Sequence, residues 1–240
     1  MKLSIIIPLF NEKNTILKVL DLIEKQVKID KQIIIVNDNS SDNSLELIQK
    51  YNFLSEHMIL NHQNNLGKGA CIKTAKKHIK GEVILIQDAD LEYSPNDYDK
   101  LIKPIIDGKS NVVYGSRVLG RKRYGNHNFT SLIRIFVNHM LTILSNIMNN
   151  QKLTDAHTCY KICTKNIFDK IELIENDFAF CPEITSKISI LNEEIYEVPI
   201  DYLGRTYEEG KKIKSIDGIK AIYALFKHSS LRSKKKFKIY

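Results

Sequence analysis

The chain has 240 residues, a formal net charge of +8 at pH 7, 43% hydrophobic residues and 27% charged residues. This composition excludes an intrinsically disordered chain, and the length suits one domain that buries a sizeable core. The positive charge favours an anionic partner such as a nucleotide, a lipid phosphate or a membrane face. We expect no nucleic acid, because the sequence contains no recognisable nucleic-acid-reading motif.

The first segment predicts a buried strand. Residues 3–8 form an apolar run that Pro8 ends, and this run is too short for the core of a secretory signal peptide, so we expect no export. The four cysteines lack the paired spacing of a zinc site. We interpret them as reduced, small core residues: Cys71, Cys159, Cys163 and Cys181.

Strands and helices are predicted to alternate through the first half of the chain. The expected strands are residues 3–8, 32–37, 58–60, 83–87 and 111–114. The expected helices are residues 13–26 and segments that begin near Ser41, at Gly67 and after Pro95. Continuous apolar runs such as residues 33–36 are typical of strands buried on both faces of a parallel sheet. The pattern predicts an α/β fold with a mostly parallel central sheet and helices on both faces.

The pattern changes after Gly115. We expect a long helix over residues 129–148, a strand over 194–200, a helix over 215–228 and then a basic tail. Polar residues interrupt the apolar stretch 129–148, so it falls short of the ~18 apolar residues that a membrane-spanning helix needs. No internal repeat and no long linker divides the chain, so we predict a single domain.

The strand at 83–87 ends in two carboxylates, Asp88 and Asp90, spaced one residue apart. Alternate residues of an extended segment point the same way, and ligands collect at the carboxyl ends of strands in an open α/β sheet. The two side chains can therefore share one cation, and Mg²⁺ suits such a pair together with substrate phosphates. A second pair, Asp97 and Asp99, follows a helix-start signal, and we interpret it as structural.

The segments after the neighbouring strands leave two interpretations open. Asp38 would accept hydrogen bonds from a base N–H or a ribose hydroxyl, or it would only belong to a strand-to-helix turn. Gly67, Lys68 and Gly69 would let backbone N–H groups approach an anion, or they would only begin a helix. Their spacing excludes a P-loop enzyme and a nicotinamide enzyme of the usual kind.

The order of these motifs resembles glycosyltransferase family 2, and within it most closely the dolichyl- and polyprenyl-phosphate sugar transferases. The matching segments are residues 6–12, 36–40, 65–70, 87–92, 115–117, 153–155, 197–200 and 205–213. The resemblance implies a GT-A fold, a metal-bound nucleotide sugar and inversion at the anomeric carbon. The chain departs from the family at Asn37, where Asp is frequent, and at Glu92, where the lipid-phosphate enzymes often have Gln.

The resemblance also implies roles for individual residues. The implied nucleotide-sugar-binding residues are Pro8, Phe10, Asn11, Glu12, Asp38, Lys68, Asp88, Ala89 and Asp90. The implied ligands of Mg²⁺ or Mn²⁺ are Asp88, Asp90 and Glu92. The implied catalytic residues are Asp155 and the phosphate-binding cations Arg117, Arg205 and Lys211. Arg121 and Arg123 are either further phosphate-binding cations or surface charges, and His157 is either a titrating group or a packed structural residue.

We therefore predict an enzyme that moves a hexose from a UDP- or GDP-sugar to polyprenyl phosphate at the cytoplasmic face of a membrane. Residues 1–116 would bind the nucleotide sugar, residues 117–228 would bind the acceptor, and residues 229–240 would form a basic tail. A phosphate acceptor is already largely ionised at neutral pH and needs no general base.

Two alternative functions remain open. A family member that glycosylates a saccharide hydroxyl would need a base, which we assign to Asp155. A non-catalytic nucleotide-sugar-binding regulator would bind the donor without turnover. The helix 129–148 is either an interfacial helix or a core helix, and the tail is either lipid-binding or solvated. The membrane contact would be peripheral or would run through a separate membrane subunit.

Overall fold

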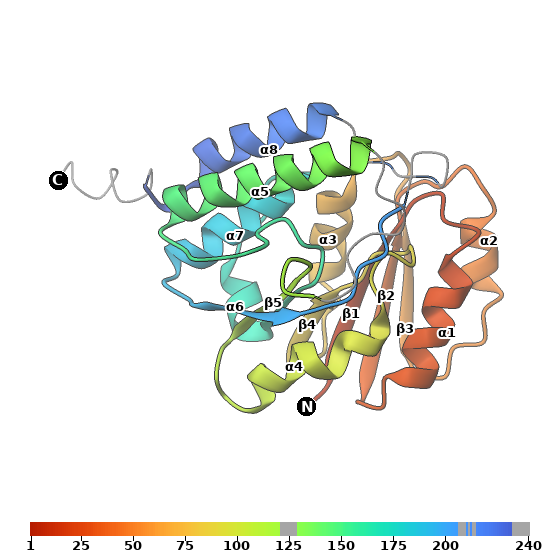
Figure 1. The fold of residues 1–240 in the computed structure, drawn as a ribbon. Helices are drawn as coiled ribbons and strands as arrows, with labels where there is room; N and C mark the ends of the chain where they lie inside the picture. Colours follow the sequence, from red (N-terminus) through yellow and green to blue (C-terminus); the bar gives the residue numbers. More distant parts are fainter. Residues whose placement is uncertain (121–128, 206–209, 211, 213–214, 232–240) are drawn as a thin grey trace.

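The computed structural model describes residues 1–120, 129–205, 210, 212 and 215–231. Within these residues, the centre is a seven-stranded sheet with the order β3-β2-β1-β4-β6-β5-β7 (Figure 1). The strands are β1 (Leu3–Leu9), β2 (Lys31–Asn37), β3 (Glu56–Asn61), β4 (Val83–Ile86), β5 (Val112–Ser116), β6 (Lys161–Thr164) and β7 (Ile195–Pro199). All neighbouring pairs are parallel except those of β6, which runs antiparallel to β4 and β5.

Helices cover both faces of this sheet, as predicted (Figure 1). They are α1 (Ile16–Gln26), α2 (Ser44–Gln49), α3 (Lys68–Lys76), the 3₁₀ helix η1 (Pro95–Asp97), α4 (Tyr98–Ile106), α5 (Phe129–Asn149), α6 (Lys165–Lys170), α7 (Phe180–Ile190) and α8 (Ser215–His228). Helix α1 packs on η1, whereas α3 packs on α7. Helices α5 and α8 lie side by side and both contact α7, so they form an outer layer.

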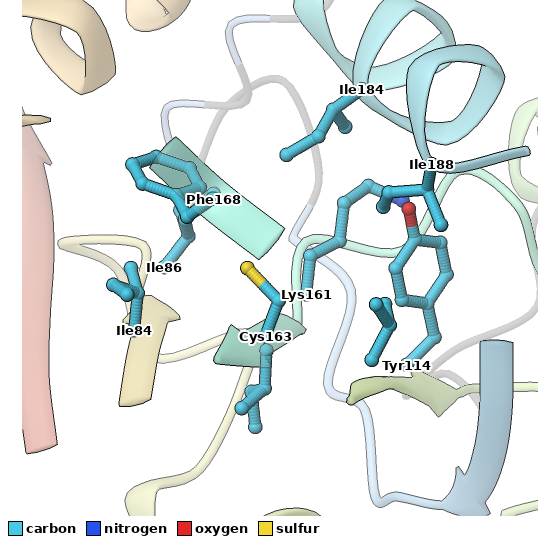
Figure 2. Close-up of a pocket in the computed structure, with 10 residues that line it drawn as sticks. Ile84, Ile86, Tyr114, Lys161, Cys163, Phe168, Ile184 and Ile188 are labelled. Atoms are coloured by element: carbon cyan, nitrogen blue, oxygen red, sulfur yellow. The ribbon is translucent and has the colours of Figure 1, made fainter. Parts of the chain in front are cut away.

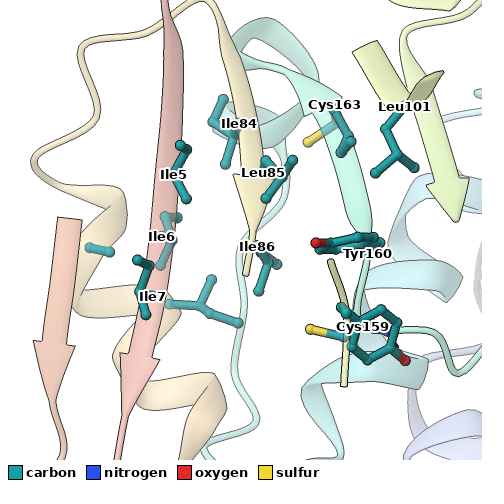
Figure 3. Close-up of a cluster of buried hydrophobic side chains, with 14 of the residues drawn as sticks. Ile5, Ile6, Ile7, Ile84, Leu85, Ile86, Leu101, Cys159, Tyr160 and Cys163 are labelled. Carbon is teal, nitrogen blue, oxygen red and sulfur yellow. Dashed lines mark hydrogen bonds between the residues drawn. The ribbon is translucent and has the colours of Figure 1, made fainter. Parts of the chain in front are cut away.

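The apolar runs of the sequence form the middle of the sheet. Ile5, Ile6 and Ile7 of β1 have no exposed surface, and Figure 3 shows them beside the residues of β4. Ile5 lies opposite Leu85, and Ile6 lies opposite Ile86. A strand with helices on both faces buries every side chain, and each buried isoleucine contributes about 1.5–3 kcal/mol. This burial explains why consecutive isoleucines, rather than an alternating pattern, mark β1.

The sequence pattern did not predict three elements between residues 161 and 190. These are β6, α6 and α7. Strand β6 has only four residues, begins with the polar Lys161 and is placed by antiparallel pairing with β4 and β5, which lie far away in the sequence. The expected reduced cysteines agree with the structure, because all four thiols are free.

The glycines at the start of α3 are needed for packing. Gly67 has a positive φ of 99°, and a Cβ atom there would lie 2.6 Å from the carbonyl oxygen of Asn176. A Cβ atom at Gly69 would lie 2.4 Å from the carbonyl oxygen of Glu175. The N–H of Ala70 also donates to the Asn176 carbonyl at 2.9 Å. Of the two interpretations of this loop, the packed helix start therefore has direct structural support.

We predict that Gly69→Ala lowers the free energy of unfolding by about 1–3 kcal/mol, because the methyl group overpacks a rigid backbone contact. Urea denaturation of the purified protein measures this loss. Gly218→Ala in α8 is the matched control, since its Cβ meets no atom within 4 Å. The control should be neutral or gain up to ~1 kcal/mol from helix propensity. Equal stability of the two variants would contradict the packing argument.

Candidate active site

The polar residues singled out by sequence gather at one edge of the sheet. Strands β1, β2 and β4 are parallel, so their carboxyl ends open on the same side. Glu12 follows β1, Asp38 follows β2, and Asp88 and Asp90 follow β4. Such an edge is where open α/β sheets bind ligands. The topology therefore brings together residues that are as much as 78 positions apart in the chain, from Glu12 to Asp90.

A buried amide fixes the turn that carries Asp88 and Asp90. The hydroxyls of Tyr98 and Tyr160 both donate to Oε1 of Gln87 at 2.8 Å. Nε2 of Gln87 in turn donates to the Asp88 carbonyl at 2.9 Å. Beyond it, the N–H of Glu92 donates to Oδ1 of Asp90 at 3.0 Å. The two carboxylates thus leave β4 on a backbone with little freedom.

Lys68 neutralises the first of these carboxylates. Its ammonium group forms an ion pair with Oδ1 of Asp88 and lies 3.2 Å from Sγ of Cys159. Burial disfavours the charge of Asp88, but the Lys68 charge, hydrogen bonds from Cys159 and Lys68 and the Arg205 charge together hold the pKa of Asp88 below its usual value. Asp90 differs, because burial and the charges of Asp88 and Glu92 raise its pKa to about 7. The site therefore holds more negative charge than Lys68 alone compensates.

Arg205 brings the C-terminal part of the chain onto the same carboxylates. Its Nη1 and Nη2 each donate to Glu12 at 3.0 Å, and Nη2 also donates to Oδ2 of Asp90 at 2.7 Å. Lys212 adds a second cation 2.5 Å from Oε1 of Glu12. Lys212 was not among the predicted site residues, although it lies in the matched segment 205–213. Lys211, the predicted cation, lies outside the described residues.

Glu92 holds this C-terminal segment in place. Its Oε2 accepts from the hydroxyl of Tyr202 at 2.5 Å, and its Oε1 accepts from the backbone N–H of Arg205 at 2.9 Å. Its Oε1 also lies 3.6 Å from Nε of Arg205. Both oxygens of Glu92, the third carboxylate of the predicted metal ligands, thus accept hydrogen bonds from Tyr202 and Arg205 in this structure. Tyr202 is a further residue that sequence reasoning missed.

The carboxylates at the end of β4 fit a hard divalent cation. Asp88 and Asp90 offer oxygen ligands of the kind that Mg²⁺ and Mn²⁺ prefer. Burial, together with the negative charges of Asp88 and Glu92, raises the pKa of Asp90, and a divalent cation would offset that clustered charge. Asp88 and Asp90 would hold the ion, with Glu92 close behind them. Such a cation would supply positive charge where a departing diphosphate becomes negative.

A second cluster, made of Asp38, His62 and Cys71, has three potential ligand atoms within 4.8 Å of one another. In the structure it is a closed hydrogen-bond network. Asp38 accepts from Nδ1 of His62 at 2.7 Å and from the backbone N–H groups of Leu66 at 2.9 Å and Gly67 at 2.7 Å. Burial and the adjacent Asp38 raise the pKa of the Cys71 thiol well above its usual value. Asp38 therefore anchors the loop before α3, and its contact with a nucleotide base stays a prediction.

The other predicted donor residues shape the turns around the site. Asn11 has a positive φ of 49°, and its Oδ1 accepts from the N–H of Ser41 at 2.8 Å. The carbonyl of Ala89 accepts from the hydroxyl of Thr15 at 3.0 Å. Pro8 and Phe10 are half-buried at the end of β1. The predicted cations Arg121 and Arg123 lie outside the described residues.

Arg117 and Asp155 form a buried pair in the second half of the chain. Nε and Nη2 of Arg117 donate to the two Asp155 oxygens, each at 2.7 Å, and the backbone N–H of Arg117 adds a third bond at 3.1 Å. Burial opposes the charge of Asp155, but Arg117 holds the pKa of this carboxyl below its usual value. Tyr202 connects the pair to Glu92, since its ring centroid lies 5.2 Å from Cζ of Arg117. Asp155 is therefore engaged as a counter-ion.

Two basic side chains, Lys161 and His157, lie near the Arg117–Asp155 pair. Nζ of Lys161 donates to the Ala156 carbonyl at 2.8 Å and lies 3.7 Å from the ring centroid of Tyr114. Figure 2 shows Lys161 beside Tyr114 at a cavity of about 10 Å³, too small for a substrate. Burial and the Lys161 charge lower the pKa of His157 to about 4. His157 is therefore neutral near pH 7, in agreement with its interpretation as a packed structural residue.

Comparisons with known proteins identify the family of this chain. The family model described as Glycosyl transferase family 2 matches residues 4–172. Dolichyl-phosphate beta-glucosyltransferase ALG5A of Trichomonas vaginalis is 29% identical over 94% of this chain and 72% of its own length. The uncharacterized protein MJ1222 of Methanocaldococcus jannaschii is 26% identical over 93% of this chain and 90% of its own length.

The fold also matches solved structures. Glucosyl-3-phosphoglycerate synthase from Mycobacterium tuberculosis, in complex with Mn²⁺, uridine diphosphate and glucosyl-3-phosphoglycerate, has a TM-score of 0.68 at 15% identity. The match covers 96% of this chain and 80% of the synthase. At this level of identity the likeness establishes the fold, which is the GT-A fold.

We predict that Asp155→Asn lowers the free energy of unfolding by about 3–5 kcal/mol, because it leaves the Arg117 charge buried without its partner. Urea denaturation tests this prediction without any assumption about activity. The double variant Arg117→Met with Asp155→Leu removes both charges and should lose less than the single variant. An equal or larger loss in the double variant would show that shape, rather than charge, dominates at this position.

Proposed function

Since this chain belongs to glycosyl transferase family 2, we propose that it moves a hexose from a UDP- or GDP-sugar to polyprenyl phosphate in a metal-dependent, inverting reaction. The observation that carries this proposal is the Arg117–Asp155 pair. It gives the second half of the chain a buried cation and leaves Asp155 with its oxygens occupied. That arrangement suits an anionic acceptor better than a neutral hydroxyl.

The donor end of the proposal rests on the edge at β1, β2 and β4. Asp88 and Asp90 would hold Mg²⁺ or Mn²⁺ on the diphosphate, and Arg205 and Lys212 lie where cations would offset its charge. Charge stabilisation of the leaving group is the main requirement of this reaction. Lys211 would add to it. The glucosyltransferase relatives and the uridine diphosphate in the solved neighbour favour UDP-glucose as the first donor to test.

The choice of a phosphate acceptor in this proposal depends on whether the acceptor needs a general base. A phosphate monoester has a second pKa near ~6, so it can attack the anomeric carbon without a general base. A sugar hydroxyl needs a base within hydrogen-bond reach. Both oxygens of Asp155 accept from Arg117, and its pKa is lowered, so it makes a weak base. These contacts of Asp155 favour a phosphate acceptor over the saccharide-hydroxyl alternative, for which Asp155 is the assigned base.

The outer layer of the molecule supports a lipid acceptor. Helices α5 and α8 each expose large apolar side chains at three- and four-residue spacing, which defines one face of each helix. These residues are Ile133, Phe136, Val137, Met140, Ile143 and Ile147 on α5, and Ile216, Ile219, Ile222, Tyr223 and Phe226 on α8. The two helices lie side by side in Figure 1, and we call their two rows of exposed residues together the apolar face.

We propose that the apolar face rests on the cytoplasmic surface of a membrane, where the prenyl chain is held. Large apolar patches mark sites of interaction, and amphipathic helices with such faces lie in the membrane interface. Across the described residues, no helix is both long and apolar enough to span a membrane. The basic residues 234, 235, 236 and 238 of the tail would add attraction to anionic lipid.

Lipid-linked transfer tests the function directly. With labelled UDP-glucose, Mn²⁺ and polyprenyl phosphate, we expect organic-solvent-extractable label, and we expect only background with EDTA or with Asp90→Ala. Asp99→Ala is the matched control, because Asp99 is an exposed residue of the second carboxylate pair, in α4. GDP-mannose in a parallel reaction resolves the donor.

Each other result of this experiment points to a different function. Label in a water-soluble saccharide product would support the hydroxyl acceptor. Saturable binding of the nucleotide sugar without any product would support the regulator. Full activity in EDTA would remove the metal from the proposal.

Membrane contact is tested with vesicles of phosphatidylglycerol and phosphatidylcholine. We predict that Phe136→Glu with Ile219→Glu weakens co-sedimentation at least about tenfold, since each buried apolar side chain is worth about 1.5–3 kcal/mol. Both residues are 64% exposed, so the changes should not disturb the core. Leu54→Glu, at 77% exposure outside α5 and α8, is the control. Equal binding of all variants would show that the apolar face does not meet lipid.

A further inference from the structure

Glu197 on β7 grips the backbone of the segment that carries Asp155. Its Oε2 accepts from the backbone N–H of Thr154 at 2.7 Å, and its Oε1 accepts from the backbone N–H of Asp155 at 3.0 Å. Among the described residues, no lysine or arginine forms an ion pair with Glu197. Its negative charge is therefore turned toward these amides, and charge-assisted bonds of this kind are about twice as strong as neutral ones.

Hydrogen bonds between hydroxyl groups, which we call the relay, connect Glu197 to the turn after β5. The hydroxyl of Thr154 donates to Oε2 of Glu197 at 3.0 Å, so the Thr154 oxygen is left to accept from the hydroxyl of Ser116 at 2.7 Å. The Ser116 oxygen then accepts from the N–H groups of Val118 and Leu119, each at 3.2 Å. One carboxylate thus fixes both the segment before β6 and the turn after β5.

Arg117 is held between these two segments. Ser116 and Val118, its neighbours in the chain, belong to the turn that the relay closes. Its guanidinium and its own backbone N–H both donate to Asp155. Both supports of the Arg117 side chain therefore lead back to Glu197. Glu197 begins the matched segment 197–200, but the resemblance assigns it no role.

We propose that Glu197 is a positioning residue that sets the direction of Arg117 toward the acceptor phosphate. The inference rests on the proposed function, in which Arg117 serves the acceptor. Loss of the Glu197 charge would release the segment at 154–155 and let Arg117 turn away from its productive geometry. A misplacement of about 1 Å in a positioned group is enough to lower turnover by roughly a hundredfold.

The test is Glu197→Gln, which keeps the size of the side chain. If the amide oxygen stays on Thr154, the amide NH₂ faces the N–H of Asp155, and two donors then oppose each other. We expect kcat to fall at least tenfold and the KM for polyprenyl phosphate to rise severalfold, while the KM for the nucleotide sugar changes less than twofold. Glu194→Gln is the matched control, since it makes the same change at an exposed residue just before β7.

Two further variants test the relay. Thr154→Val removes the hydroxyl but keeps the backbone N–H, so it should show an intermediate loss. Thr154→Ser restores a hydroxyl and should recover most of the wild-type turnover. A general loss of structure would not be rescued in this selective way.

Hydrogen exchange separates this inference from the proposed function. Faster exchange of the amides at 154 and 155 in Glu197→Gln than in Glu194→Gln would support the positioning role even if wild-type protein does not glycosylate polyprenyl phosphate. Unchanged exchange and unchanged kinetics would overturn it. An equal loss of donor affinity, acceptor affinity and thermal stability would also overturn it, because Glu197 would then be a purely structural residue.

Discussion

The concentration of carboxylates at one edge of the sheet is the constraint on which the site depends. Glu12, Asp90 and Glu92 are each less than a tenth exposed, and like charges at such depth are costly unless cations oppose them. The cations come from distant parts of the chain. Lys68 lies at the start of α3, and Arg205 follows β7 in the chain. Charge compensation therefore explains why Arg205 lies against the carboxylates that follow β1 and β4.

The same arrangement prepares the site for its proposed donor. Arg205 contacts both Glu12 and Asp90, so it offsets the charge of Glu12 and of one of the two carboxylates that would hold a divalent cation. In the proposed reaction, a diphosphate with its cation adds nearly balanced charge, and Arg205 can exchange a carboxylate for a phosphate oxygen. Guanidinium binds either group through two oxygens. The ion pairs with Glu12 and Asp90 thus hold Arg205 in the site, and in the proposed reaction the donor phosphate would replace them.

The polar edge at β1, β2 and β4 was predictable from the sequence because its signals are local. An unbroken apolar run followed by polar residues identifies β1, β2 and β4 without knowledge of the fold. The role of Asp155 was predictable only in part, because the residue that pairs with its carboxylate lies far from it in the sequence. In the saccharide alternative, Asp155 was assigned as a base. In the structure, its carboxylate accepts a hydrogen bond from Arg117, which lies 38 positions away in the sequence. Glu197 lies in the matched segment 197–200, yet its role was not predictable, since two of its hydrogen-bond donors are backbone amides that any sequence would provide.

The distribution of polar and apolar groups supports a covering surface over the half of the chain that is proposed to bind the acceptor. Inside, Arg117, Asp155 and Glu197 are satisfied by one another and by backbone groups. Outside, α5 and α8 expose rows of large apolar residues that a freely solvated protein would bury. Both helices belong to the part of the chain that follows Arg117. A lipid surface against that face would shelter the apolar rows and bring a prenyl-linked phosphate to the half of the protein that holds the buried arginine.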